Sequence, residues 1–177
     1  MRYLLLLFIT VCSCTNNSLQ KTSISGYVYG TTYNIVYFSD EELQLKMQID
    51  SLFNVIDMSM STYNSNSLIT KINDNENIEL DNHFKFVFNV SKNIFNKTDG
   101  YFDPTVGALV NAYGFGPGKK LNTISTQQLD SILQFTGWDK TKLSINNTIL
   151  KTHPKVYFDF NALAKGYAVD VLAELLE

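Results

Sequence analysis

Two segments of the sequence hold residues whose types and spacing suit a phosphorylated ligand. The first spans residues 156–170, VYFDFNALAKGYAVD, in which a run of β-forming residues ends at Asp159. A turn of small residues then opens a predicted helix that carries Lys165 and Gly166. A helix N-terminus with a nearby cation favours phosphate, because free backbone N–H groups and the helix dipole both attract negative charge. An aspartate beside a lysine could equally form a plain ion pair, which contributes little stability when exposed.

The second segment spans residues 98–116, TDGYFDPTVGALVNAYGFG, and combines four glycines with four aromatic residues. Each glycine costs conformational entropy unless the backbone needs its freedom, so this composition predicts a binding loop. The alternative is a tight turn at Thr98, Asp99 and Gly100, followed by an ordinary loop whose aromatic side chains fill the core. Taken together, the two segments predict one site for a flat aromatic ligand that carries phosphates.

These two segments, in this order, resemble the two signature segments of the ApbE family, the FAD:protein FMN transferases. The resemblance extends from about residue 26 to the end of the chain. It implies an α+β fold, with an ApbE-like (T-fold-like) mixed sheet and flanking helices. It also implies that residues 1–177 are the N-terminal portion of such a protein, since the G-G-E segment and the late metal-binding Asp and Thr of the family do not occur in them. We therefore expect this portion alone to be poorly soluble and inactive.

The resemblance also implies a set of site residues. It assigns FAD contacts to Tyr29, Tyr63, Tyr101, Phe102, Asp103, Asp159 and Lys165. Lys165 is the predicted catalytic residue, because its charge would offset the negative charge that develops on the phosphate. The backbone carbonyl of Ala162 is the predicted Mg²⁺ ligand. The residues by themselves allow plainer roles: Tyr29 as a cross-strand aromatic, Tyr63 as a loop anchor through its hydroxyl, and Asp103, which precedes a proline, as a turn former.

By resemblance, the reaction is a Mg²⁺-dependent transfer in which FAD is the substrate, AMP leaves, and FMN is joined to a threonine or serine of a target protein. The expected partners are flavin-accepting subunits of membrane redox complexes. Three other functions are open from the sequence. They are a Mg²⁺-dependent FAD pyrophosphatase that gives FMN and AMP, a lipoprotein remnant that binds flavin without chemistry, and a structural lipoprotein.

The N-terminus has the layout of a bacterial lipoprotein. Residues 1–13 contain a lone Arg2, a short apolar run and then small residues, as a secretory signal peptide does. The sequence Val-Cys-Ser-Cys resembles a lipobox, which would place a lipid on Cys14. Residues 14–25 are predicted to be a polar tether that begins with the lipidated cysteine and leads to a domain over residues 26–177. We expect a lipid-anchored protein of the bacterial cell membrane that faces the periplasm or the outside; a buried strand at the N-terminus is the alternative.

The composition fits one folded domain, because 177 residues with 45% hydrophobic and 13% aromatic content can bury a sizeable core. The formal net charge is −3 and no basic stripe is present, so we expect no nucleic-acid partner. Hydrophobic periodicity and turn residues predict the elements that position the two segments. They are a hairpin over residues 26–38, a helix that fades over 57–61, a short helix over 64–73, helices over 82–97 and 125–135, a hairpin over 143–152, a strand over 156–160 and a helix over 162–176. The family resemblance places Ser67 and Asn73 of the short helix near the site, whereas its residues alone predict only a helix capped by Asn or Ser.

Overall fold

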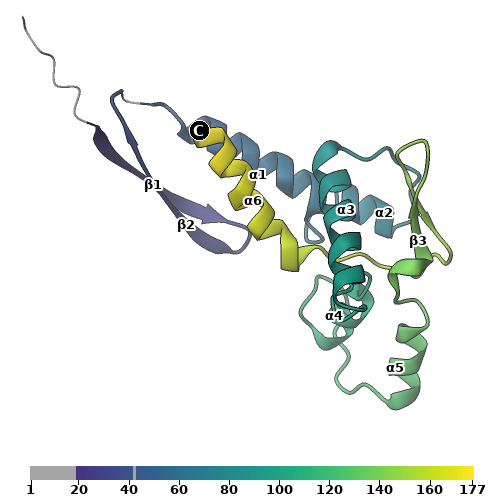
Figure 1. Cartoon of the computed structure of the whole chain (residues 1–177). Helices are drawn as coiled ribbons and strands as arrows, with labels where there is room; N and C mark the ends of the chain where they lie inside the picture. The colour runs from purple at the N-terminus through teal and green to yellow at the C-terminus, as the bar shows by residue number, and fades with distance from the viewer. Residues whose placement is uncertain (1–18, 42) are drawn as a thin grey trace, which may run out of the picture.

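The structure is a computed structural model, and it describes residues 19–41 and 43–177. It combines helices with two small antiparallel sheets (Figure 1), so the predicted α+β class is confirmed. In chain order the elements are β1 (Gln20–Val28), β2 (Thr31–Ser39), α1 (Lys46–Met60), α2 (Leu68–Asn73), α3 (Asn82–Lys97), α4 (Gly107–Tyr113), α5 (Thr126–Leu133), the short 3-10 helix η1 (Trp138–Lys140), β3 (Thr141–Leu143), β4 (Ile149–Lys151) and α6 (Asn161–Leu176). Within the described ranges, none of the helices is long and apolar enough to span a bilayer.

The hairpin of β1 and β2 turns at Tyr29 and Gly30, whose φ angles are both positive, 51° and 74°. A two-residue turn of this kind matches the right-handed twist of paired strands, and the predicted hairpin is confirmed. The predicted tether is wrong for residues 20–25, which belong to β1, because alternate residues there, such as Ile24, pack against the core. The predicted signal peptide and Cys14 lie outside the part of the chain that the structure describes.

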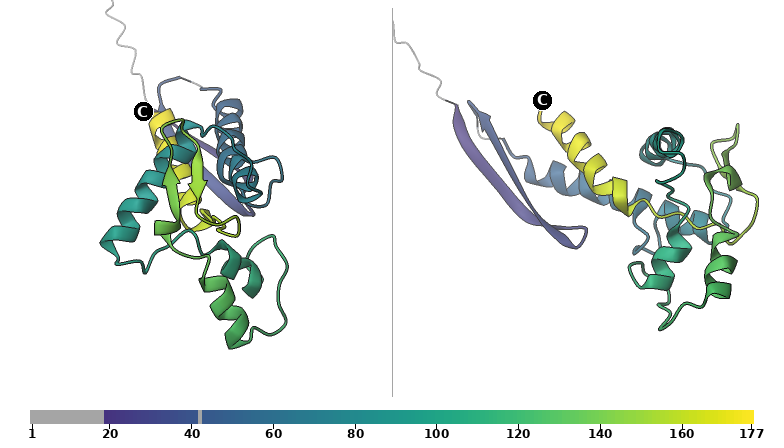
Figure 2. Two further views of the ribbon diagram at one scale, coloured as in Figure 1. Left: turned by 90° about the vertical axis from the view of Figure 1, so that its right-hand side faces the viewer. Right: turned by 60° about the horizontal axis from the view of Figure 1, so that its bottom comes forward.

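A first hydrophobic cluster joins the hairpin to α1 and α6, which run side by side (Figures 1 and 2). Its buried members are Ile35, Ile49, Phe53 and Leu172. The hairpin lies at one end of the elongated molecule, and α4 and α5 lie at the other end. The turn of the hairpin is thereby held over the middle of α1, close to the point where α6 begins.

Helix α1 continues to Met60, so the predicted fading over residues 57–61 is wrong. Packing explains the extension, because Ile56 and Met60 are each only 1% exposed and belong to the second, larger hydrophobic cluster. Propensity is a weak guide where tertiary contacts of this kind decide. The extra turn carries Asp57 toward the site described below.

Among the described residues, the segment 156–160, predicted as a strand, pairs only through an isolated parallel bridge between Val106 and Tyr157. The strand prediction is wrong because other partners occupy the backbone groups of this segment. The N–H and carbonyl of Phe158 both bond to the side-chain amide of Asn73, at 2.7 and 2.9 Å. The N–H of Asp159 donates to the carbonyl of Pro104 at 2.8 Å.

The same segment is fixed on its other side by Lys151 of β4. Its ammonium group donates to the carbonyls of Ile72 and Asn73 at the end of α2, at 3.0 and 3.2 Å, and to that of Val156 at 3.0 Å. Burial lowers the pKa of Lys151 to about 8, against the opposing effect of the Asp74 charge. The lysine thus ties β4 and the end of α2 to the chain that leads into α6.

Replacing Asn73 tests the role of this amide in the fold. Asn73→Ala leaves the buried N–H and carbonyl of Phe158 without partners, so we expect the free energy of unfolding to fall by roughly 2–4 kcal/mol. Urea denaturation measures the change. The matched control is Asn66→Ala at an exposed position, which should shift the free energy by less than about 0.5 kcal/mol. Equal stability of the two variants would contradict the structural role of Asn73.

Candidate ligand-binding site

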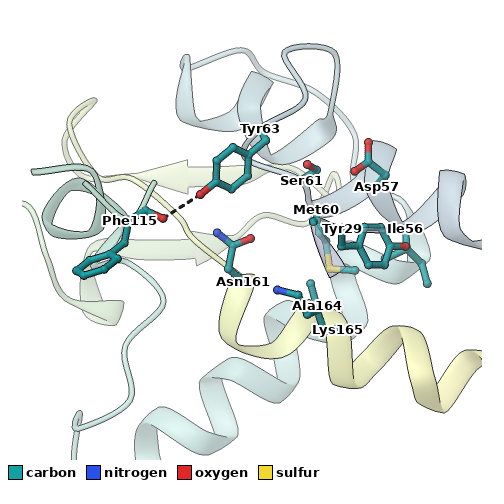
Figure 3. Close-up of a pocket in the computed structure, with 11 residues that line it drawn as sticks. Tyr29, Ile56, Asp57, Met60, Ser61, Tyr63, Phe115, Asn161, Ala164 and Lys165 are labelled. Atoms are coloured by element: carbon teal, nitrogen blue, oxygen red, sulfur yellow. Dashed lines mark hydrogen bonds between the residues drawn. The ribbon is translucent and has the colours of Figure 1, made fainter. Parts of the chain in front are cut away.

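A cavity of about 590 Å³ lies where the β1–β2 turn, the end of α1, the loop after α4 and the start of α6 meet (Figure 3). Its volume is in the range of small-molecule sites. The lining residues are Tyr29, Gly30, Ile56, Asp57, Met60, Ser61, Tyr63, Phe115, Asn161, Ala164 and Lys165. The walls are mainly apolar and aromatic, and a few polar groups come from three different elements.

The start of α6 supplies one polar wall. Asn161, Ala164 and Lys165 lie three and four residues apart, so they share one face of the helix. Asp159 stands just before the helix and accepts bonds from the backbone N–H of Asn161 at 2.7 Å and from its side-chain amide at 3.1 Å. Burial raises the pKa of Asp159, while these two bonds and the positive charge of Lys165 oppose the rise. Asp159 therefore orients Asn161, which in turn lines the cavity.

The opposite wall comes from the hairpin turn and the end of α1. Tyr29 lines the cavity, and its hydroxyl donates to the carbonyl of Phe53 at 2.7 Å. Burial raises the pKa of Tyr29, and the negative charge of Asp57 raises it further, so the phenol stays neutral. The carboxylate of Asp57 accepts a bond of 2.7 Å from the side-chain amide of Asn64.

At the mouth, Tyr63 crosses from the loop after α1 to the loop after α4. Its hydroxyl donates to the backbone carbonyl of Phe115 at 2.9 Å (Figure 3). Both side chains are largely exposed, at 64% and 77%. Two loops that are 52 positions apart in the sequence are thus joined across the cavity edge.

The two segments singled out in the sequence lie side by side, as predicted. The Val106–Tyr157 bridge and a bond of 3.2 Å from the N–H of Gly107 to the carbonyl of Tyr157 connect them. Gly107 is needed at this contact, since a Cβ there would lie 2.9 Å from that carbonyl oxygen. The prediction of a loop is wrong for residues 107–113, which form the short helix α4. Gly114, in the left-handed conformation, ends this helix.

Of the predicted site residues, Tyr29, Tyr63 and Lys165 line the cavity. The others do not: Tyr101 is 97% exposed, and Phe102, Asp103, Asp159 and Ala162 are not part of the lining. One carboxylate oxygen of Asp103 accepts bonds from the N–H and the hydroxyl of Thr105, at 2.8 and 2.7 Å, as a turn former does. FAD contacts for these residues stay a prediction.

Sequence reasoning missed Asp57, Asn161 and Phe115 as lining residues. Asn161 had a local signal, because it stands two residues after Asp159 at a helix start, where such a pair commonly forms a turn. Asp57 had none, since its position depends on the packed last turn of α1. Phe115 lines the cavity from a loop whose course depends on tertiary contacts.

The described residues do not by themselves form a Mg²⁺ site. Among them, no three or more His, Cys, Asp or Glu side chains are grouped so that they could hold a metal ion. Ala162 lies in the first turn of α6, where its carbonyl could supply one oxygen. One carbonyl falls short of the several oxygen ligands that Mg²⁺ prefers.

Comparison with known proteins assigns the chain to a family. The model of the ApbE family matches residues 29–177. The chain belongs to the ApbE family. The predicted family membership is therefore confirmed, and the cavity described above is the candidate site of an ApbE chain.

Relatives and solved structures agree with this assignment. The FAD:protein FMN transferase of Haemophilus influenzae is 34% identical over an alignment 182 residues long. The alignment covers 96% of this ApbE chain and 52% of that relative. The enzyme of the same name from Escherichia coli K12 is 33% identical over 171 residues, 91% of this chain and 49% of the relative. The flavin transferase ApbE from Vibrio cholerae superposes with a TM-score of 0.83 at 30% identity, over 90% of this chain and 54% of that one, which confirms the ApbE-like fold. The chain spans about half the length of the curated relatives it matches.

The raised pKa of Asp159 predicts a pH-dependent effect of Asp159→Asn. Because the folded protein binds the proton more tightly than the unfolded chain, ionisation of Asp159 costs stability as the pH rises above its ordinary value of 3.8. We expect Asp159→Asn to be more stable than the wild type at pH 7, and the difference to vanish at pH 3.5. Urea denaturation at the two pH values measures it, with Asp130→Asn at an exposed position as the control. A less stable Asp159→Asn at pH 7 would show that the carboxylate bonds to Asn161 outweigh the cost of burying the charge.

Proposed function

We propose that the protein takes part in the transfer of FMN from FAD to a threonine or serine hydroxyl of a target protein, with release of AMP. The observation that carries the proposal is the joint placement of Tyr29, Tyr63 and Lys165 around one cavity. Two aromatic rings suit a flat ring system, and a cation at the start of a helix suits its phosphates. The names of the relatives from H. influenzae and E. coli, FAD:protein FMN transferase, support the same reaction.

In the proposed reaction, the hydroxyl oxygen of the acceptor attacks the phosphorus of the FMN half. The pyrophosphate P–O bond breaks, AMP leaves with the bonding electrons, and the hydroxyl proton is released. The ammonium group of Lys165 offsets negative charge on the pyrophosphate as it develops. Asn161, held by Asp159, offers a preoriented amide in the same wall. The walls around Ile56 and Met60 keep water from one side of the ligand.

The proposal includes dependence on Mg²⁺. When bound, the ion would neutralise charge on the pyrophosphate oxygens, as divalent metals do in phosphoryl transfer. Of the described residues, Ala162 would contribute its carbonyl oxygen.

We further propose that the protein is a lipoprotein, anchored to the bacterial cell membrane through Cys14 and facing the periplasm or the outside. The charged start, short apolar run and small residues of positions 1–14 support this location. The proposed partners are flavin-accepting subunits of membrane redox complexes, which would meet an anchored enzyme at the same surface.

The reaction itself is the first test. The native gene product that contains residues 1–177 is incubated with FAD, Mg²⁺ and an acceptor protein that carries a D-G-x-[TS]-x-A-[TS] sequence, the acceptor motif that the resemblance to the ApbE family implies. We expect AMP and FMN-labelled acceptor in equal amounts, measured by chromatography and by intact mass. The matched control is an acceptor with alanine at both [TS] positions of this sequence. AMP with free FMN would instead indicate a pyrophosphatase, and FAD binding without AMP would indicate a flavin-binding protein; either result contradicts the transferase proposal.

Lys165 is the residue whose replacement should weaken FAD binding most. Loss of a charge-assisted contact to phosphate predicts a dissociation constant that is about 10- to 150-fold higher for Lys165→Ala, with partial recovery in Lys165→Arg. Quenching of FAD fluorescence measures the constant. The control is Lys92→Ala, an exposed lysine on α3 outside the cavity. Equal losses in both variants would show that overall charge, and not the site, attracts FAD.

A further inference from the structure

The loop that follows α4 passes close to the side chain of Asn111. The amide oxygen of Asn111 accepts a bond of 2.9 Å from the N–H of Gly118. A Cβ at Gly116 would lie 2.1 Å from the same oxygen, and one at Gly118 would lie 2.6 Å from the carbon of the side-chain amide. The loop backbone therefore passes so close to this amide that residues with a Cβ at positions 116 and 118 would displace it.

This loop forms one edge of the candidate site through Phe115. The side chain of Phe115 is 77% exposed, so burial does little to fix it. What reaches the site edge is its backbone carbonyl, which accepts the bond from the hydroxyl of Tyr63 (Figure 3). That carbonyl belongs to the peptide group shared with Gly116, and the Asn111 amide occupies the space where a Cβ of residue 116 would lie. The Asn111 side chain therefore lies directly beside this peptide group.

Among the described residues, the backbone–backbone bonds of this loop lie at its two ends. The N–H groups of Gly114 and Phe115 donate to the last turn of α4, and the N–H of Leu121 donates to the carbonyl of Ala112 at 2.9 Å. Between these ends, residues 116–118 depend on the Asn111 side chain. An exposed loop with three glycines within residues 114–118 would otherwise sample many conformations.

We propose that Asn111 is a positioning residue of the FAD site. It fixes the peptide between residues 115 and 116 so that the Phe115 carbonyl meets the Tyr63 hydroxyl, and this bond holds the Tyr63 ring at the cavity mouth. Asn111 does not line that cavity and acts through the other two residues. The inference rests on the proposed function for the identity of the ligand.

A double-mutant cycle for FAD affinity tests the inference. The four proteins are the wild type, Asn111→Ala, Tyr63→Phe and the double variant, each made as the native gene product. Each single substitution should raise the FAD dissociation constant about three- to tenfold, the range expected for one lost hydrogen bond. In the Tyr63→Phe background, Asn111→Ala should have no further effect, because the bond through which it acts is already gone.

Two more variants separate positioning from folding. Asn111→Asp keeps an oxygen that accepts from Gly118 and should bind FAD close to wild-type strength, whereas Gly116→Ala should reproduce the loss of Asn111→Ala. Thermal unfolding checks that each variant is folded, and if Asn111→Ala does not fold, Gly116→Ala takes its place in the cycle. The control is Gln127→Ala on α5, exposed and outside the cavity.

Each outcome decides the matter. Losses that add in the double variant, or unchanged affinity in Asn111→Ala, overturn the inference while leaving the proposed function intact. A wild-type protein that does not bind FAD overturns both the proposed function and the inference. Coupled losses together with recovery in Asn111→Asp support the positioning role.

Discussion

The paired hydrogen bonds between Asn73 and Phe158 are the constraint on which the rest of the site depends. One side-chain amide satisfies both backbone groups of a residue that is 85 positions later in the chain. This holds the segment 156–160 in place, although within the described part of the chain its strand pairing is limited to the Val106–Tyr157 bridge. The rings of Phe158 and Phe160 then pack against Phe84 of α3, with centroids 6.5 and 5.1 Å from it. Helix α6 begins directly after these anchors, so the placement of its first turns follows from them.

From this anchor the site is assembled by short-range contacts. Asp159 is partly buried just before α6, and this burial raises its pKa. From the same position its carboxylate orients Asn161 and feels the positive charge of Lys165. On the other side, the neutral hydroxyl of Tyr29 donates its hydrogen bond to the carbonyl of Phe53, so the Tyr29 ring lines the cavity as an apolar surface. Charge in the cavity is thus divided, with Asp57 at the α1 wall and Lys165 at the α6 wall. A ligand with phosphates at one end and hydrogen-bond donors at the other would match this division.

Local signals made part of the fold and the site predictable. The first hairpin, the helices over 82–97 and 162–176, and the hairpin near Asn147 follow from turn chemistry and hydrophobic spacing, and the structure confirms them. The two signature segments also identified the family, and with it three of the lining residues. These features depend on neighbours in the sequence, which is where sequence reasoning is strongest.

Long-range contacts explain what the sequence did not reveal. The segment 156–160 has the composition of a strand, yet its partners are a side chain of α2 and a loop before α4. The resemblance to the ApbE family placed Asn73 near the site, but nothing local indicates that its amide bonds to Phe158, so far away in the chain. The same holds for Asp57, which depends on the packing of α1, and for Asn111, whose role depends on two glycines and on Tyr63 across the cavity.

The most direct test of this account is a crystal structure of the native gene product with FAD. The account predicts that the pyrophosphate lies at the start of α6 within hydrogen-bond distance of the Lys165 ammonium group, and that the flavin ring lies against Tyr29 or Tyr63. FAD bound elsewhere, or bound in this cavity with its phosphates away from α6, would contradict it.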